Sequence, residues 1–292
     1  MNFLIHQGAL GDWVLTFPIL RALTGPTVVA APWSKALLAA DLFDQVQALN
    51  IELREFSRMH APGGPAALGP AIGDMIDQSR LIISFVSDGD DDWSRNIRLL
   101  APQAKHVFLL SRPPESWRRH LCDWHSEQLQ QQGLELTEVD IERRGQRDGR
   151  VLIHPGSGGQ DKCWPAENFE ELIAELRAGG RTVDVVLGEV EADTWPSDLL
   201  QRWSSRHGAE TITSLQTLRT RIDATDFYVG NDSGPTHLAA QMGVTTVALF
   251  GPTCPTRWGP RGPAVTILAP PKPAPMNWLK TTTVAKACRV EA

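Results

Sequence analysis

The strongest constraint on the fold is the stretch of residues 226–260, DFYVGNDSGPTHLAAQMGVTTVALFGPTCPTRWGP. It predicts a short buried strand at 227–229, a turn at 230–234, a helix opened by Pro235 and a second buried strand at 245–250. A strand, a turn, a helix and a strand in this order are typical of a parallel α/β sheet.

The turn at residues 230–234 allows two interpretations. Asp232 or Ser233 can cap the helix, as short polar side chains often do. The free N–H groups at a helix start also attract anions, and Gly234 lets a phosphate approach the backbone closely. The turn alone does not decide between a capped helix and a phosphate site.

Both halves of the chain begin with a strand, a glycine-containing loop and a helix. In the first half the strand covers 1–5 and the helix 13–23, where Pro18 should cause a kink or an early first turn. In the second half the strand covers 151–153 and the helix 166–177. The repeated pattern predicts two Rossmann-like α/β domains that face each other across a cleft.

A polar and charged segment, residues 137–150, separates the two halves. We therefore expect an amino-terminal domain of residues 1–149 and a carboxy-terminal domain of residues 150–292. A weak helical segment near 284–290 ends the chain, and packing of this helix on the amino-terminal domain is one expectation.

Composition excludes several classes of protein. With 292 residues, 42% of them hydrophobic and 21% charged, the chain can build a proper core. The net charge of -6 argues against nucleic-acid binding. No apolar run approaches the ~20 residues that span a bilayer, and the first residues lack the basic region of a secretory signal. The four cysteines are widely scattered, which fits reduced thiols in a cytoplasm and neither a zinc site nor a disulfide framework.

Two other segments carry expectations. The acidic run at 87–92 follows a predicted strand at 81–86, and a solvated charge run is favoured there over a metal or sugar-hydroxyl site. Residues 61–73 predict a loop, and residues 117–132 predict a helix.

Three groups of residues could carry chemistry. Asp12 follows the first strand, where a carboxylate can cap a helix or act as a general base, and the residues alone favour the cap. In the loop 154–162, Gly156 and Ser157 with Lys162 suit a diphosphate better than a plain surface turn, because the turn at 230–234 offers a second anion site. His237 alone is more often structural than catalytic.

A nicotinamide site is disfavoured. Gly8 and Gly11 are spaced G-x-x-G rather than G-x-G-x-x-G, the spacing of dinucleotide-binding loops. The loop at 154–162 also lacks the G-x-x-x-x-G-K-[ST] pattern of nucleotide triphosphatases.

The chain resembles the heptosyltransferase family of inverting glycosyltransferases. The resemblance rests on GDWVLTFPILRAL at 11–23, HPGSGGQDKCWPAENFEEL at 154–172 and GNDSGPTHLAAQMGVTTVALFGPTCPTRWGP at 230–260. It implies the two-domain GT-B fold, with the acceptor in the first domain and the nucleotide-sugar donor in the second. It also implies transfer of heptose from ADP-heptose to a lipopolysaccharide-type glycan acceptor without a metal or other cofactor.

The resemblance further assigns roles to single residues. Asp12 resembles the catalytic base, which raises that interpretation above the cap. The implied donor-binding residues form three groups. The diphosphate loop contains Gly156, Ser157 and Lys162, and the donor-site turn contains Asp232, Ser233, Gly234 and His237. The ribose contact is Glu191, with Glu189 as the lesser choice. An enzyme of this kind works in the cytoplasm, and peripheral contact with the inner membrane is compatible with it.

Two alternatives remain from the sequence. A nucleotide-sugar-binding protein without transferase activity would keep the donor half, and purified protein that transfers or hydrolyses the donor would exclude it. A nicotinamide-dependent oxidoreductase is the other, which a titration with NAD against ADP would separate.

Overall fold

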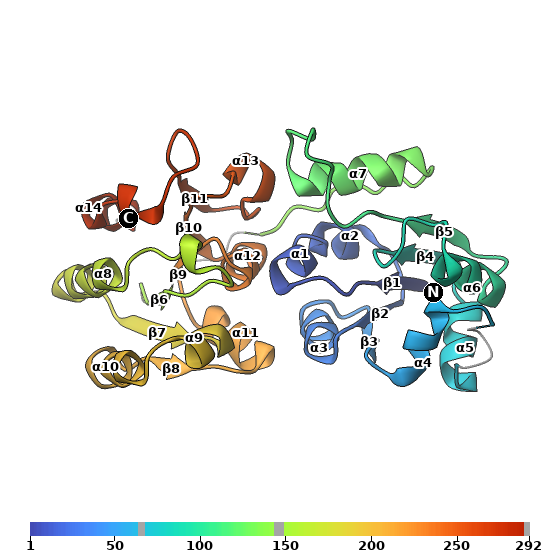
Figure 1. Cartoon of the computed structure of the whole chain (residues 1–292), viewed down its shortest axis with the longest axis horizontal. Coiled ribbons are helices and arrows are strands. Elements are labelled where there is room, and N and C mark those ends of the chain that lie inside the picture. Colours follow the sequence, from blue (N-terminus) through green and yellow to red (C-terminus); the bar gives the residue numbers. More distant parts are fainter. Residues whose placement is uncertain (64–67, 143–148, 289–292) are drawn as a thin grey trace. The chain divides into compact units, whose positions relative to one another are not determined.

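Two parallel β-sheets form the framework of the chain, one in each half (Figure 1). The computed structural model describes residues 1–63, 68–142 and 149–288. The chain divides into two units, Met1–Val139 and Asp140–Ala292. The domain boundary expected after residue 149 adjoins residues 143–148, which lie outside the described residues, so that boundary stays a prediction.

The first unit is a five-stranded sheet in the order β3-β2-β1-β4-β5, and every pair of neighbouring strands runs parallel. Its elements are β1 (Asn2–Ile5), α1 (Leu10–Val14), α2 (Phe17–Ala22), β2 (Thr27–Ala31), α3 (Trp33–Leu42), β3 (Val46–Asn50), α4 (Arg54–Ser57), the 3₁₀ turn η1 (Arg58–His60), α5 (Pro70–Asp77), β4 (Leu81–Ser84), α6 (Asp92–Leu100), β5 (Lys105–Phe108) and α7 (Leu121–Gln131).

The second unit is a six-stranded parallel sheet in the order β11-β10-β9-β6-β7-β8. Its elements are β6 (Val151–His154), η3 (Gln160–Lys162), α8 (Ala166–Ala178), β7 (Val183–Leu187), α9 (Glu189–Thr194), α10 (Ser197–His207), β8 (Glu210–Thr211), α11 (Leu215–Asp223), β9 (Phe227–Asn231), α12 (Gly234–Gln241), β10 (Thr245–Leu249), α13 (Pro255–Trp258), β11 (Val265–Leu268), η4 (Met276–Trp278) and α14 (Thr281–Ala287).

Burial explains why the central strands read as continuous apolar runs. All residues of β9 and β10 are buried, because helices cover both faces of a parallel sheet. Alternate strand side chains such as Phe227 and Val229 pack with Phe169 and Leu172 of α8. Each large side chain buried in this way stabilises the fold by about 1.5–3 kcal/mol before conformational entropy is counted.

The strand order creates one switch point in each unit. In the first, the chain passes from β1 to β2 and β3 on one side and then returns to the other side at β4. In the second, the corresponding point lies between β6 and β9. Ligands of open parallel sheets bind outside the carboxyl ends of the strands at this place. The loops after β1, β6 and β9, which the sequence singled out, are therefore the loops at the switch points.

The helix predicted at residues 13–23 forms as two helices. Pro18 lies in the first turn of α2, where its missing N–H group costs no hydrogen bond. The break falls at Thr16, whose hydroxyl donates to the carbonyl of Trp13 at 2.7 Å. The predicted effect of Pro18 is confirmed, but the first helix already starts at Leu10, so Asp12 is helical rather than in the loop.

Other element boundaries differ from the sequence expectation. Helix α5 begins at Pro70, inside the expected loop at 61–73. Helix α7 begins only at Leu121, because His120 caps it by accepting a hydrogen bond from the Cys122 N–H group at 3.1 Å. In the acidic run, Asp91 caps α6 in a reciprocal pair with Ser94, so this carboxylate is used inside the protein.

The final helix packs inside the second unit. Val284 and Ala285 of α14 are buried in the same hydrophobic cluster as α8. The expectation that this helix also packs on the amino-terminal domain stays a prediction. No helix among the described residues is long and apolar enough to cross a membrane.

Candidate active site

Asp232 is the centre of a polar cluster at the switch point of the second unit. Its Oδ2 atom accepts hydrogen bonds from Lys162 Nζ at 2.8 Å and from Thr253 Oγ1 at 2.7 Å. The Nε2 atom of His237 lies 3.7 Å from its Oδ1 atom. Three loops, after β6, β9 and β10, thus meet at one carboxylate.

The charge of Asp232 is fixed by these partners. Burial alone would raise the pKa of this carboxyl group. His237, Lys162 and Thr253 outweigh the burial and lower the pKa to about 2. Asp232 is therefore ionised throughout the neutral range, and it balances the charge of the Lys162 ammonium.

The loop after β6 is tied to the turn after β9 by buried hydrogen bonds. Ser157 Oγ donates to the carbonyl of Asp232 at 2.8 Å, and Asn231 Nδ2 donates to the carbonyl of Pro155 at 2.7 Å. Asn231 Oδ1 in turn accepts from the N–H group of Trp164 at 3.0 Å. The sequence correctly paired these two loops, but the Ser157 hydroxyl is buried and used within the protein.

Lys162, Ser233 and Gly234 are the predicted donor-site residues that remain partly exposed. Ser233 is the residue before α12, yet its side chain makes no capping hydrogen bond. Within the described chain, the N–H groups of Ser233 and Gly234 have no hydrogen-bond partner. These two donors and the Lys162 ammonium are the groups an anion can reach.

Glu191 is placed differently from its expected ribose-binding role. It is only 2% exposed, and its Oε2 atom accepts from the Gly188 N–H group at 2.7 Å and lies 3.3 Å from His154 Nε2. Burial opposes its ionisation, but His154 and Gly188 lower the pKa of the carboxyl group below its usual value. Glu191 therefore holds the loop around it in place, whereas the side chain of Glu189 is exposed.

Contact with Glu191 explains why residue 156 is a glycine. A Cβ atom at this position would lie 1.9 Å from the Glu191 carboxyl carbon. We expect Gly156→Ala to lower the free energy of unfolding by about 1–3 kcal/mol, because Glu191 would have to leave its buried partners. Chemical denaturation measures this change.

Gly158→Ala is the matched control for that variant. Gly158 lies in the same loop, and a Cβ atom there meets nothing within 4 Å. The control should keep wild-type stability. Equal stability of both variants would show that Glu191 does not pack tightly on Gly156.

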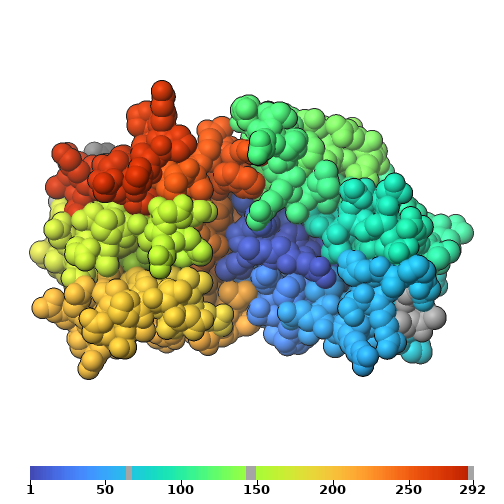
Figure 2. All heavy atoms as spheres, in the orientation of Figure 1, coloured from blue at the N-terminus to red at the C-terminus, as the bar shows by residue number. Residues whose placement is uncertain are grey.

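At the switch point of the first unit, Asp12 lies in the first turn of α1. Its side chain is 21% exposed, and its Oδ2 atom lies 3.6 Å from Nη2 of Arg112. Arg112 comes from the segment between β5 and α7, part of the green surface of this unit in Figure 2. The N-cap position of α1 is occupied by Ala9, and no side chain of the described residues caps this helix. Asp12 is therefore not the cap that the residues alone favoured.

A neutral histidine holds the loop in front of Asp12. His6 Nδ1 accepts from the Gly8 N–H group at 3.1 Å, and its ring lies 5.2 Å from that of Phe85 after β4. Burial lowers the pKa of His6 to about 3, with contributions from His125 and Lys35. The neutral ring can therefore accept this hydrogen bond at neutral pH.

The sequence missed Asn231, Thr253 and Arg112. Asn231 is a fully buried amide at the end of an apolar strand, and a buried amide requires partners, so this was a usable signal. Thr253 follows β10 as Asp232 follows β9, which also points to the same sheet edge. Nothing local marks Arg112, because it lies 100 positions from its partner. Among the described residues no group of three or more His, Cys, Asp or Glu side chains is arranged to hold a metal ion.

Comparison with known proteins decides the family. The sequence profile of glycosyltransferase family 9 (heptosyltransferase) matches residues 94–287. The chain belongs to this family. The match covers most of the second unit and the last part of the first, so it includes the whole Asp232 cluster.

Curated relatives match over shorter segments. Lipopolysaccharide heptosyltransferase 3 of Escherichia coli K12 is 28% identical over 124 residues, 41% of this chain and 36% of the relative. Lipooligosaccharide heptosyltransferase 2 of Campylobacter jejuni serotype O:2 is 48% identical over 121 residues, 39% of this chain and 38% of the relative. These matches span well under half the length of either relative.

Solved structures resemble the whole chain. The E. coli heptosyltransferase WaaC with ADP has a TM-score of 0.72 at 17% identity and covers 98% of both chains. The E. coli ADP-heptose lps heptosyltransferase II has a TM-score of 0.68 at 14% identity, with 98% of this chain and 97% of that chain covered. At such identities the likeness shows the fold, which is the GT-B fold expected from the sequence.

Proposed function

We propose that this chain is an inverting, metal-independent glycosyltransferase that transfers heptose from ADP-heptose to a glycan of the lipopolysaccharide type. Its relatives are named as lipopolysaccharide and lipooligosaccharide heptosyltransferases. A solved structure with the same fold, at a TM-score of 0.61, holds ADP-2-deoxy-2-fluoro heptose. In the proposal, residues 1–149 bind the acceptor and residues 150–292 bind the donor.

The observation that carries the proposal is the Asp232 cluster. Asp232 holds the Lys162 ammonium at the carboxyl edge of the sheet, beside the N–H groups of Ser233 and Gly234. A cation and two backbone donors that converge at a helix start suit the diphosphate of a nucleotide sugar. His237, which is buried behind Asp232, supports the carboxylate rather than contacting the ligand.

The same groups would stabilise the leaving group. As the bond between the anomeric carbon and the diphosphate oxygen breaks, negative charge grows on the diphosphate. Lys162 and the N–H groups at the start of α12 are preorganised to receive that charge, the role a metal ion takes in other enzymes. The exposed Glu189 is the residue assigned to the nucleotide ribose.

Asp12 is assigned as the general base. Its carboxylate takes the proton of an acceptor hydroxyl while the hydroxyl oxygen forms a bond to the anomeric carbon. The nucleoside diphosphate leaves from the opposite face of that carbon, so a single displacement inverts the configuration. The Nη2 atom of Arg112 lies 3.6 Å from the Asp12 carboxylate and is its positively charged neighbour.

Incubation with ADP-heptose and de-O-acylated lipopolysaccharide tests the function. We expect a transferred heptose with inverted anomeric configuration by NMR, and unchanged rates in EDTA, because Lys162 and backbone donors supply the positive charge. ADP should raise the melting temperature more than UDP, GDP or dTDP. A ligand at 100 times its Kd stabilises the folded protein by about 2.7 kcal/mol, which such a measurement detects.

The outcomes separate the alternatives. ADP binding without transfer or hydrolysis would favour a nucleotide-sugar-binding protein. A preference for UDP would assign another donor, and loss of activity in EDTA would contradict the metal-free mechanism. Peripheral binding to the inner membrane from a cytoplasmic location is the remaining part of the proposal, and a liposome flotation assay tests it.

A further inference from the structure

Trp33, Lys35 and Glu52 follow the carboxyl ends of β2 and β3, and Lys35 contacts the loop that leads to Asp12. Trp33 is the first residue of α3, directly after β2, and Glu52 follows β3. The Oε2 atom of Glu52 accepts from the backbone N–H group of Trp33 at 3.3 Å. Lys35 lies two residues further along α3.

Lys35 links this group to Asp12. Its ammonium donates a 2.6 Å hydrogen bond to the carbonyl of Gly8, in the loop that enters α1. Burial lowers the pKa of the Lys35 ammonium below its usual value, and the nearby carboxylates of Glu52 and Asp12 offset part of this effect. Among the described residues Gly8 is its hydrogen-bond acceptor, so the remaining donors of the ammonium are available to a ligand.

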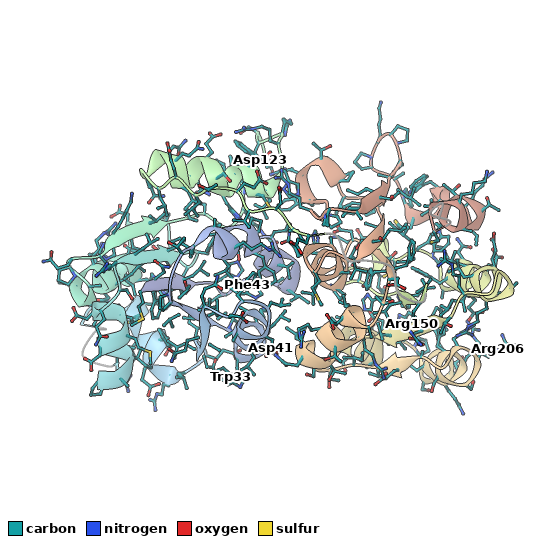
Figure 3. All side chains as sticks on the ribbon, turned by 180° about the vertical axis from the view of Figure 1, so that it is seen from behind. Trp33, Asp41, Phe43, Asp123, Arg150 and Arg206 are labelled. Carbon is teal, nitrogen blue, oxygen red and sulfur yellow. The ribbon has the colours of Figure 1, made fainter. Side chains whose placement is uncertain are left out.

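Trp33 is an exposed tryptophan of this unit. It is 46% exposed, whereas Trp13 and Trp93 are completely buried. Figure 3 labels it at the edge of the unit, and Leu53, next to Glu52, is also 39% exposed. The backbone N–H group of Trp33 makes the hydrogen bond to Glu52, and the indole takes no part in it.

The chemistry of this group selects a class of ligand. An exposed aromatic face stacks on the C–H groups of a sugar ring, since the face of the ring is negatively polarised. Lys35 supplies donors and Glu52 an acceptor, the pair that sugar hydroxyls require. The cations of Lys35 and Arg112 together balance the carboxylates of Glu52 and Asp12, so no excess positive charge is available here to bind a phosphate or carboxylate group.

We propose that Trp33, Lys35 and Glu52 form a subsite for a neutral pyranose ring of the acceptor. The proposal rests on the glycosyltransferase function and deepens it. The ring stacks on Trp33, its hydroxyls bond to Lys35 and Glu52, and the acceptor is thereby held on the side of the first unit that carries Asp12. The three residues bind and position the acceptor and take no part in proton transfer.

Saturation-transfer NMR on the full-length protein tests the subsite. The probes are methyl α-D-mannopyranoside, which is neutral, and methyl β-D-glucuronide, which is anionic. We expect saturation of the neutral ring protons, competition by de-O-acylated lipopolysaccharide and weaker binding of the anionic sugar. Trp33→Ala should weaken the neutral sugar by about tenfold, Trp33→Phe by less, and Glu52→Gln should also weaken it.

Leu99→Ala is the matched control, because Leu99 on α6 is 72% exposed and lies outside this group. In the transfer assay Trp33→Ala should raise the acceptor KM by about tenfold and leave the donor KM unchanged. Failure of wild-type protein to bind the neutral sugar, equal affinity of Trp33→Ala and Leu99→Ala, or a preference for the glucuronide would overturn the subsite.

The readouts distinguish this proposal from the proposed function. The melting-temperature shift with ADP should be the same in Trp33→Ala and wild type, because the residue lies outside the donor-binding unit. An intact ADP response and intact transfer with an unchanged acceptor KM would refute the subsite alone. Absence of both ADP binding and transfer in wild-type protein would refute the function itself.

Discussion

Replacement of Asp12 by Asn is expected to lower kcat for glycosyl transfer by about 10²–10⁴-fold, the usual contribution of general base catalysis. Asparagine keeps the shape of the side chain in the first turn of α1 but cannot accept the hydroxyl proton. The affinity for ADP should not change, since the Asp232 cluster lies in the second unit. Initial rates and an ADP titration measure the two effects.

Asp41→Asn is the control for this variant. Asp41 is exposed on α3 of the same unit (Figure 3), so its replacement alters charge equally without touching the proposed site. Its kcat should equal that of the wild type. Wild-type rates in Asp12→Asn would show that another group removes the proton.

Asp232→Asn is expected to lower the free energy of unfolding at pH 7 by about 2 kcal/mol, the value of a carboxyl pKa lowered to about 2. The folded state holds this carboxylate ionised more strongly than the unfolded state does. Its stabilisation is therefore complete above the unfolded pKa and is lost as the pH falls towards about 2. The stability difference between wild type and variant should narrow between about pH 4 and pH 2.

Urea unfolding of both proteins over a pH series measures this prediction. Asp193→Asn, on the exposed side of α9, is the control and should track the wild type at every pH. A difference between wild type and Asp232→Asn that stays constant with pH would mean that lost packing, rather than lost charge, destabilises the variant. The ADP-induced shift should also fall in Asp232→Asn, because Lys162 loses the partner that holds it.

Much of the framework could be predicted from local patterns. Apolar runs such as those of β2 and β10 identify parallel strands, since both faces of the sheet are covered. Glycine-containing loops after the first strand of each half indicated the switch points. Helix starts were less predictable, because capping by residues such as His120 depends on side-chain geometry that no short pattern specifies.

The roles inside the candidate site divide in the same way. Lys162 and Asp232 were proposed from their loops, and the structure brings them to 2.8 Å. Glu191 was proposed for a ligand and proves to be buried against Gly156 and His154. Its burial depends on the path of β6 and α9 together, which residue type and spacing do not reveal.

The sequence by itself determined the α/β class, the two halves, the family resemblance and the loops in which the chemistry lies. Only the tertiary structure decided which polar groups are free. Asp12 and Arg112 meet although they lie 100 residues apart in the sequence. Thr253 after β10 bonds to Asp232 after β9, and the N–H group of Trp33 after β2 bonds to Glu52 after β3. Parallel strands place their carboxyl ends at one edge of a sheet, so contacts there depend on strand order rather than on distance along the chain.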